Sequence, residues 1–594
     1  MKPKITDRTA LLLLVFIVLG VYYPAIFAPM NSVDDPGMYA YLLNMDSFNF
    51  REIFVPGGSG SYYRPLLIVS YLIDKYVWGL EISFMHLENI LFHLFNTLLV
   101  FAIARKVIVM QSSESGMVPF TSALLFAVHP INTEAVDWIA GRTDLLAAFF
   151  LFLSVLFLLH RERSISSPLL AAFCMFVACL AKETAIFFLP AALLFPFFVR
   201  QHCANDLTYK EIFLNNWQHF LYFQISCVGY FILRSQAFSR GDNGIRQVYA
   251  HVAGEKSAET IHQLNSVFKS AGFYLKKLFV PFPLNFGIIH VSDLYIILGI
   301  LLVIVSFWLF TRRTLPAFIF LCAASIGSSA LIIPLIHQTW TPLAERYMYI
   351  PSAFFIIGCI QIIPKRRNDP YYHKVVITAG CIVIIIAIYG TVSRTLIWQD
   401  NLTLYQDTLN KSPGFEPAQN EIANELFARG RIDEASEIIF SLKLPANLNN
   451  RQYGLVSKAV ASVNRGDFVG ARNYLDEALK DPGKHEVEII KRLLKLYDLE
   501  LLTKNSEREK MYPEMLRLLS RLYSITSDSF YQYRLGQIYM QIKDIKRAQE
   551  AFSIAAIKAP ENAYYRVPSQ KLAAKLLAEI DKDEVNLKRP FIIQ

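Results

Sequence analysis

Residues 128–146 read VHPINTEAVDWIAGRTDLL, and they lie between two strongly apolar stretches of the chain. Ionisable side chains within this segment are His129, Glu134, Asp137, Arg142 and Asp144. Such groups at a membrane boundary cost free energy unless they are paired or functional. We therefore predict a binding or catalytic site in this segment.

The composition of the rest of the chain is that of a membrane protein. Of its 594 residues, 54% are hydrophobic and only 18% are charged, which departs from a soluble average. The net charge of +9 does not indicate nucleic-acid binding, because Lys and Arg form short runs beside apolar segments. The cysteines are scattered and form no C-x-x-C pair, so we predict neither a disulfide framework nor a zinc site.

Eleven apolar runs are long enough, or nearly long enough, to cross about 30 Å of hydrocarbon. They cover roughly residues 9–28, 84–104, 117–135, 144–160, 167–181, 185–199, 214–235, 293–310, 314–334, 347–363 and 374–393. If these runs alternate in direction, the basic runs fall on one side, which is then the cytoplasm. These runs include residues 105–106, 161–163, 312–313 and 365–367. The sequence predicts an all-α polytopic protein with a cytoplasmic N-terminus.

The same alternation places two long loops, 30–83 and 237–292, on the external side. Residues 261–282 within the second loop are amphipathic, with Phe273 and Phe279 beside Lys276 and Lys277. We expect this stretch to lie in the membrane interface or to re-enter. The alternation fails if the stretch crosses.

After about residue 398 the chain becomes charged and helical, and this part is predicted to lie outside the cytoplasm. One stretch has the spacing of a tetratricopeptide repeat, in which small residues let paired helices pack closely. Its residues are Leu535, Gly536, Tyr539, Ala548, Phe552, Ala555 and Pro560. We predict two domains, a membrane domain at 1–397 and a helical solenoid at 398–594.

The first external loop begins with two adjacent carboxylates, Asp34 and Asp35, and ends with Arg64 in the sequence YYRPL. A carboxylate at the membrane surface can act as a base for a lipid-borne substrate, and arginine can hold a phosphate. Two simpler interpretations remain open at this stage. The acidic pair can cap a helix after a turn, and an arginine beside aromatic residues can anchor the chain in the interface.

Further acid–base groups are predicted at the same external surface. They are His129 with Glu134, Arg142 with Asp144, Lys182 with Glu183, and Glu345 with Arg346. A local pair between Arg142 and Asp144 is the alternative to a functional role. Polar residues also share one face of the helix that begins near residue 84, at positions His86, Asn89, His93 and Asn96. For these we favour interhelical hydrogen bonds over metal ligation.

Several blocks of this sequence resemble the transmembrane and tetratricopeptide-repeat O-mannosyltransferase family. The blocks are HPINTEAVDWIAGRTDLLA at 129–147, AKETAI at 181–186, LAERYMYIPS at 343–352, the Asp34–Asp35 pair and YYRPL at 62–66. The resemblance covers roughly residues 9–420 and includes the order of membrane segment and repeats. Asn132 and Thr143 depart from the family pattern, so the sugar and the acceptor are left undetermined.

The resemblance implies a glycosyltransferase of the GT-C class that uses lipid-phosphate sugars on the lumenal or periplasmic side. It implies transfer of a mannose-like hexose from a polyprenyl or dolichyl phosphate to Ser or Thr of a protein, with inversion. Asp35, with Asp34 beside it, is the expected base. The expected donor-site residues are Arg64, His129, Glu134, Arg142, Asp144, Lys182, Glu183, Glu345 and Arg346.

No residue set for a metal is evident in the sequence, and a divalent Mg or Mn ion is left open. The expected partners are the lipid donor, membrane lipids and an acceptor protein presented by the repeats, with no nucleic acid. We expect the cytoplasmic membrane of a bacterium or archaeon, or the endoplasmic reticulum in a eukaryote. The alternatives are a glycan or glycolipid acceptor for the same donor, and a non-enzymatic membrane-anchored repeat scaffold.

Overall fold

In this computed structural model, the described residues are helical apart from an isolated β-bridge between Ile288 and Leu343. The structure describes residues 6–43, 48–55, 62–110, 117–160, 166–199, 208–237, 257–332, 341–363, 369–429, 465–482, 486–503, 508–559 and 565–587, with scattered residues between some of them. The basic runs 161–163 and 365–367, loop residues 56–61 and 238–256, and Pro560 lie outside the described residues. The all-α prediction is confirmed for the part of the chain that the structure describes.

The chain divides into two compact units, the first comprising residues 1–55 and 60–421 and the second built on residues 422–594. The α-helices up to the end of the first unit are α1 (Asp7–Tyr22), α2 (Asp35–Leu43), α3 (Phe50–Phe54), α4 (Pro65–Trp78), α5 (Ile82–Met110), α6 (Met117–Ala127), α7 (Thr133–Asp137), α8 (Arg142–Leu158), α9 (Ser166–Ala181), α10 (Leu189–Val199), α11 (Tyr209–Asn215), α12 (Trp217–Ala237), α14 (Ser257–Phe279), α15 (Tyr295–Arg312), α16 (Leu315–Gly327), α18 (Tyr349–Ile362), α19 (Pro370–Trp398), α20 (Asn401–Lys411) and α21 (Glu416–Ala428). Short 3-10 helices connect them: η1 (Tyr23–Phe27), η2 (Pro130–Asn132), η3 (Ile139–Gly141), η4 (Glu183–Phe188), η6 (Ser328–Leu331) and η7 (Glu345–Met348).

Local sequence signals explain where several of these helices begin and end. The side chains of Thr6, Asp369 and Asp400 accept hydrogen bonds from the first turns of α1, α19 and α20, as expected of N-caps. Helix α4 begins with Pro65 and ends at Gly79, which has a left-handed φ of 67°, an arrangement that suits proline at a helix start and glycine at its end. These caps satisfy backbone groups that a helix end leaves unpaired.

Among the described residues, five helices are long and apolar enough to span a membrane, so the chain is a multi-pass membrane protein. They are Asp7–Phe27, Ile82–Met110, Ile139–Leu158, Tyr295–Arg312 and Tyr371–Trp398. Shorter apolar helices occupy Met117–Ala127, Ser166–Ala181, Glu183–Phe198 and Leu315–Leu331. Eleven crossings and the side to which each end faces stay predictions.

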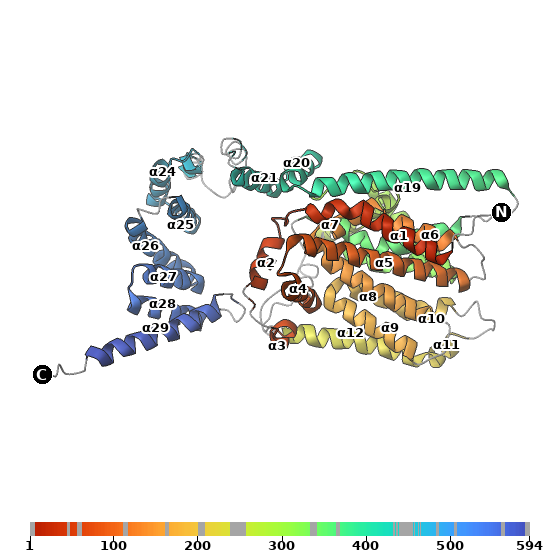
Figure 1. Cartoon of the computed structure of the whole chain (residues 1–594), viewed down its shortest axis with the longest axis horizontal. Helices are drawn as coiled ribbons and strands as arrows, with labels where there is room; N and C mark the ends of the chain where they lie inside the picture. The colour runs from red at the N-terminus through yellow and green to blue at the C-terminus, as the bar shows by residue number, and fades with distance from the viewer. Residues whose placement is uncertain are drawn as a thin grey trace. The chain divides into compact units, whose positions relative to one another are not determined.

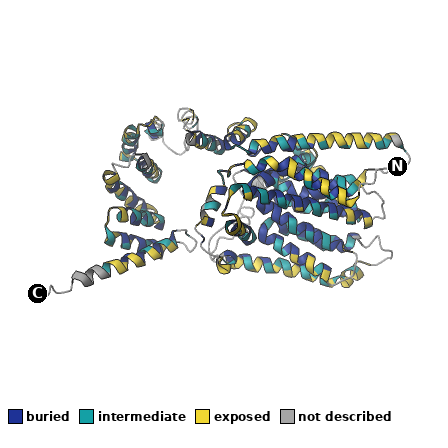
Figure 2. Cartoon of the chain, in the orientation of Figure 1, coloured by how far each residue is buried: buried dark blue, intermediate teal, exposed yellow. Residues whose placement is uncertain are grey.

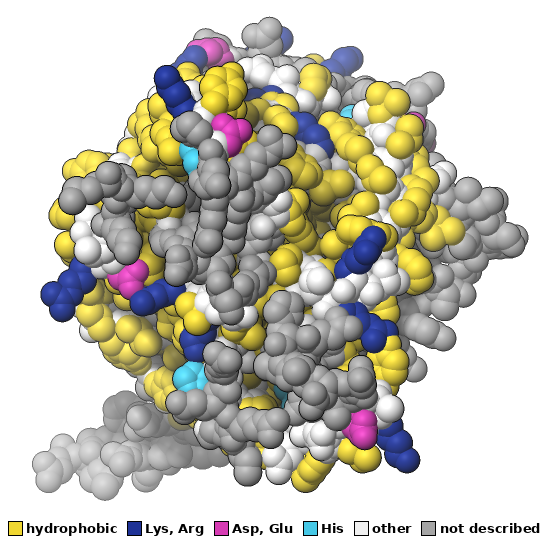
Figure 3. Space-filling view, turned by 90° about the vertical axis from the view of Figure 1, so that its right-hand side faces the viewer, with side chains coloured by type: hydrophobic (Ala, Val, Ile, Leu, Met, Phe, Trp, Pro, Cys, Tyr) yellow, Lys and Arg dark blue, Asp and Glu magenta, His cyan; other side chains and the backbone are white. Residues whose placement is uncertain are grey.

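Burial differs strongly between the helices of the first unit. Figure 2 shows that α8 is mostly buried, whereas α19 carries many exposed residues along its length. The exposed positions of α15 and α19 are largely apolar, which is expected of helices that face lipid. On the face drawn in Figure 3, Lys and Arg side chains stand among hydrophobic ones, as is typical where apolar helices end at a membrane surface.

Helices α14 and α15 pack antiparallel, and two glycines bring their backbones together. A Cβ atom on Gly272 would lie 1.9 Å from the Tyr295 carbonyl oxygen, and one on Gly299 would lie 1.9 Å from that of Phe268. Lys269 and Asp293 form an ion pair of 2.6 Å beside this contact. The packing joins the amphipathic stretch 261–282 to the candidate membrane span of α15. Whether that stretch lies in the membrane interface or re-enters the membrane stays a prediction.

We expect Gly272→Ala to lower the free energy of unfolding by about 1–3 kcal/mol, because backbone atoms cannot move aside as a side chain would. Thermal unfolding of the purified protein in detergent would measure this. Gly20→Ala in α1 is the matched control, since its new Cβ would meet nothing within 4 Å. That control should be neutral or stabilising, because alanine favours a helix by about 1 kcal/mol over glycine. Equal unfolding temperatures for the two variants would contradict the close packing.

The second unit is built from α24 (Phe468–Lys480), α25 (Glu486–Thr503), α26 (Arg508–Thr526), α27 (Ser529–Gln541), α28 (Ile545–Lys558) and α29 (Arg566–Leu587), and each helix packs on the next in chain order. At the α27–α28 contact, a Cβ on Gly536 would lie 2.8 Å from the Phe552 ring. Ala548 and Ala555 are buried with it. The small residues of the repeat-like motif therefore lie where two helices approach closely, and the tetratricopeptide assignment stays a prediction.

Candidate functional site

The segment 128–146 folds into a compact chain reversal between α6 and α8, through η2, α7 and η3. Asn132 Nδ2 donates to the Phe126 carbonyl at 2.8 Å, and the Ile131 N–H donates to His129 Nδ1 at 3.3 Å. A Cβ on Gly141 would lie 2.4 Å from the Ala135 carbonyl oxygen. Only glycine fits at this return, which brings the start of α8 against α7. In Figure 1, α7 lies at the same end of the first unit as α2 and α4.

Asp35 connects the stretch that follows η1 to this segment. Its side chain is fully buried, and it accepts hydrogen bonds from the N–H groups of Asn31 at 2.8 Å and Ala140 at 3.2 Å. Burial raises the pKa of Asp35 to about 7, although both N–H groups act in the opposite direction. Asp34 is exposed. The two adjacent carboxylates therefore have different surroundings, and Asp35 has the environment of a base poised near neutral pH.

Three cation–carboxylate pairs, here called the ion-pair cluster, surround the same segment. They are Arg64–Glu183, Lys182–Asp144 and Arg346–Glu134. Each pair joins parts of the chain that are far apart in sequence, and all six side chains are at least three-quarters buried. Because each cation has one carboxylate partner, the formal charge of the cluster is zero.

The geometry of the pairs differs. Arg64 binds Glu183 in a two-pronged manner, with N···O distances of 2.9 Å and 2.6 Å. Lys182 Nζ lies 2.6 Å and 2.7 Å from the two carboxylate oxygens of Asp144. Arg64 and Arg346 also act electrostatically on Lys182, so the three cations share one small region. Such a concentration of donors suits a ligand that is strongly anionic.

Aromatic rings complete the cluster, and the sequence prediction did not include them. The Arg346 guanidinium lies 4.8 Å from the centre of the Trp138 ring and 5.0 Å from that of Tyr347. Lys182 Nζ lies 5.2 Å from the Tyr347 ring. Asp35 accepts a hydrogen bond from the Ala140 N–H, and Trp138 lies two residues before Ala140. The stretch from Trp138 to Ala140 therefore links the carboxylate to the cations. The only sequence signal for these rings was their position inside the charged blocks.

Arg142 was predicted as a donor-site residue, and the structure pairs it with residues outside the ion-pair cluster. Its guanidinium donates to Asp74 at 2.6 Å, to Asn89 at 2.9 Å and to the Met85 carbonyl at 2.8 Å. Glu88 lies 3.2 Å away. Arg142 does not pair with Asp144, so the local pair considered from sequence is wrong. These contacts support a structural role that joins α4, α5 and α8.

Glu345 and His129 also have structural partners. Glu345 is buried and pairs with Lys277 of α14 at 2.5 Å, and it accepts the Asn285 N–H at 3.1 Å. His129 Nε2 lies 3.3 Å from the Leu278 carbonyl. His129 and Glu345 thus connect the charged blocks in which they lie to α14 and to the residues that follow α14. Lys277 was seen in the sequence only as part of an amphipathic helix.

The prediction of interhelical hydrogen bonds from the polar face of α5 is confirmed for His93 and Asn96, whereas both ring nitrogens of His86 are buried without a hydrogen-bond partner in the part of the chain that the structure describes. Asn89 donates to the Trp138 carbonyl at 2.8 Å, His93 Nδ1 lies 2.7 Å from the Tyr349 hydroxyl, and Asn96 donates to the Leu145 carbonyl at 3.0 Å. Among the described residues, no three His, Cys, Asp or Glu side chains are grouped to hold a metal ion. The carboxylates of the ion-pair cluster are instead matched by cations.

Sequence comparison relates the chain to known transferases. It is 31% identical over 161 residues to mouse "Protein O-mannosyl-transferase TMTC1", covering 25% of this chain and 16% of that protein. It is 24% identical over 369 residues to the Caenorhabditis elegans "Protein O-mannosyl-transferase F38B6.6", covering 59% of this chain and 49% of that protein. The chain is a distant homologue of these proteins. The resemblance predicted from the motifs is confirmed, and the chain spans less than half the length of these relatives.

No model of a known protein family matches the chain. Among solved structures, ArnT from Cupriavidus metallidurans bound to undecaprenyl phosphate aligns over 86% of this chain and 81% of its own, with 15% identity and a TM-score of 0.36. The archaeal oligosaccharyltransferase AglB from Archaeoglobus fulgidus aligns over 70% and 59%, with 12% identity and a TM-score of 0.34.

Proposed function

We propose that this protein is a membrane glycosyltransferase that moves a hexose, mannose or a close relative, from a polyprenyl or dolichyl phosphate to Ser or Thr of a protein. The observation that carries the proposal is the buried Asp35 carboxylate, bonded to the segment that also holds the ion-pair cluster. Distant homology to O-mannosyl-transferases supports the reaction class. We place the reaction on the external side of the membrane.

The proposed chemical step is one displacement at the anomeric carbon. Asp35 accepts the proton of the acceptor hydroxyl while that oxygen forms its bond to C1 of the sugar. The bond from C1 to the phosphate oxygen breaks, and the electron pair leaves with the lipid phosphate. A single displacement inverts the anomeric configuration. The leaving phosphate is already a stable anion, so the site needs positive charge and hydrogen-bond donors more than a general acid.

Arg64, Lys182 and Arg346 are the proposed phosphate-binding groups. Their carboxylate partners hold them in place, while the side chains of Arg64 and Arg346 remain 23% and 19% exposed. In this proposal that exposure makes Arg64 and Arg346 accessible to a ligand, whereas Arg142 is fully buried. Tyr347 then gives the sugar an apolar ring face, the buried Trp138 holds Arg346, and Arg142, Glu345 and His129 position the segments that carry the site.

The helices from about residue 398 onward are proposed to present the acceptor polypeptide. Successive packed helices, such as those of the second unit, form extended surfaces suited to binding a peptide. We propose that this part lies outside the cytoplasm, at the cytoplasmic membrane of a prokaryote or in the endoplasmic reticulum of a eukaryote.

The test is transfer by the purified protein from a panel of radiolabelled polyprenyl-phosphate monosaccharides, with membrane proteins and lipids of the source organism as acceptors. We expect label from one donor to enter protein and to be released by base treatment, which cleaves sugars linked to Ser or Thr. Label found only in the lipid fraction would replace the protein acceptor by a glycolipid. No transfer from any donor by folded protein would contradict the proposed function.

A further inference from the structure

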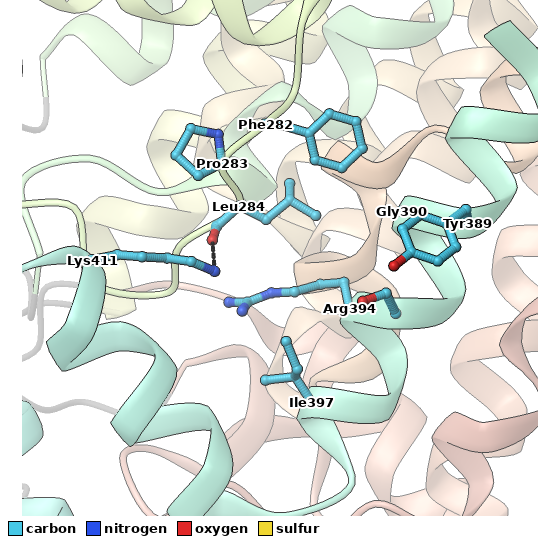
Figure 4. A pocket seen from close by; sticks show the side chains of 9 residues that line it. Phe282, Pro283, Leu284, Tyr389, Gly390, Arg394, Ile397 and Lys411 are labelled. Atoms are coloured by element: carbon cyan, nitrogen blue, oxygen red, sulfur yellow. Dashed lines mark hydrogen bonds between the residues drawn. The ribbon is translucent and has the colours of Figure 1, made fainter.

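The first unit contains a second polar region, in a cavity of about 530 Å³ beside the last turns of α19. Phe282, Leu284 and Ile397 contribute apolar walls, and Arg394 and Lys411 contribute the charged groups. Figure 4 shows the Arg394 side chain reaching across the cavity towards the end of Lys411. None of these residues belongs to the ion-pair cluster.

Arg394 has hydrogen-bond donors to spare. The residue is only 3% exposed, and its Nη1 donates to Asp407 at 2.6 Å. Among the described residues, its Nε and Nη2 atoms have no hydrogen-bond acceptor. Lys411 shares Asp407 and also donates to the Leu284 carbonyl at 2.7 Å. Neither Nε nor Nη2 of Arg394 is among the solvent-inaccessible atoms that lack a partner, so both are accessible to an acceptor placed in the cavity.

The position of the cavity points to the kind of ligand. Arg394 lies one turn before the end of α19, and Tyr371–Trp398 of this helix is a candidate membrane span. On the same flank of α19, Tyr389 is 75% exposed and Ile386 is 50% exposed. The cavity therefore adjoins a lipid-facing surface near the end of a span, which is the depth of lipid headgroups.

We propose that this cavity binds the phosphate head of a membrane lipid. The phosphate accepts hydrogen bonds from Arg394, whose planar fork suits its oxygens, and the first part of the lipid chain contacts the apolar walls. The residues that line the cavity are not those of the ion-pair cluster, although Arg394 acts electrostatically on Glu345, the neighbour of Arg346. Occupancy of the cavity does not depend on sugar transfer. A glycerophospholipid and a polyprenyl phosphate both carry a phosphate that Arg394 would bind, and the experiment below distinguishes between them.

The experiment measures lipid binding to the full-length protein in maltoside micelles by thermal shift and native mass spectrometry. The probes are phosphatidylglycerol, undecaprenyl phosphate, diacylglycerol, which lacks phosphate, and inorganic phosphate, which lacks a chain. We expect at least one of the two lipid phosphates to bind and to raise the unfolding temperature, and which one does so identifies the source of the phosphate. Equal stabilisation by diacylglycerol or by inorganic phosphate at the same concentration would overturn the proposal.

Three variants locate the binding. Arg394→Gln should weaken binding at least tenfold. Ser393→Trp should also weaken binding, because the new ring fills the cavity. Ser393 lies exposed on the cavity wall, so this variant should fold, and it tests the site even if Arg394→Gln misfolds. Ile382→Trp adds the same ring on the exposed flank of α19, about 16 Å further along the helix, and should bind as the unmodified protein does. Unchanged binding by Ser393→Trp would overturn the assignment.

Discussion

Asp35→Asn is expected to lower sugar transfer at least 100-fold while leaving the protein folded. The amide keeps the shape of the side chain but cannot take the acceptor proton, and general-base catalysis contributes about 10²–10⁴-fold. Initial rates at saturating donor, measured beside the unfolding temperature, would check this. Asp34→Asn is the matched control, because Asp34 is adjacent and exposed. It should retain at least a third of the activity.

The pH dependence of the same step follows from the raised pKa. Because burial raises the pKa of Asp35 to about 7, the carboxyl is protonated below that pH and cannot act as a base. Transfer should therefore rise as the pH passes through about 7 and level off above it. A rate that is flat from pH 5.5 to 8.5, with chemistry rate-limiting, would contradict the assignment of Asp35 as the base.

Asp35 should also affect stability, in the opposite direction to its effect on rate. Between about pH 4 and pH 7 the folded state binds a proton that the unfolded state has lost, so the free energy of unfolding falls as the pH rises through this range. At pH 8 the folded protein holds a buried charge, which Asp35→Asn removes. The amide has one acceptor oxygen for the two N–H groups that bond the two carboxylate oxygens of Asp35, so the variant also loses a hydrogen bond. These effects oppose each other, and we expect the variant to unfold at pH 8 at a temperature close to that of the unmodified protein. A large loss of stability would indicate that Asp35 is mainly structural.

Arg142→Ala should have the largest effect on folding, lowering the free energy of unfolding by about 3–5 kcal/mol. Arg142 and Asp74 are both fully buried, so removing the cation leaves an uncompensated carboxylate. It also removes the hydrogen bonds to Asn89 and to the Met85 carbonyl. Thermal unfolding monitored by size-exclusion chromatography in detergent would measure the loss.

The double variant Arg142→Met with Asp74→Leu separates charge burial from packing. It removes both partners and should recover more than half of the lost stability, since replacing a whole buried pair by apolar residues is often close to neutral. If Arg142→Ala instead folds normally and only donor binding is weakened, the structural role is wrong and Arg142 belongs to the donor site.

The sequence alone determined the apolar runs that form helices in the membrane unit and the charged blocks of the candidate site, but it predicted a loop at 30–83, where the structure has α2, α3 and α4. Helices occupy the apolar runs because hydrophobicity and helix caps act within a few residues along the chain. The shared face of His93 and Asn96 was visible for the same reason, because spacings of three and four repeat along one helix. Asp35 and the charged blocks were likewise found from their residue types next to apolar runs.

The tertiary structure alone decided which charges meet. Arg142 pairs with Asp74 and not with Asp144, while Asp144 pairs with Lys182. Glu345 pairs with Lys277. Arg394 borders a cavity whose other wall, at residues 282–284, is more than 100 positions earlier in the sequence. These partners are separated by many residues, so helix packing selects them and local spacing carries no signal. Burial then sets their chemistry, because the same carboxyl group is exposed at Asp34, whereas at Asp35 it is buried and its pKa is raised.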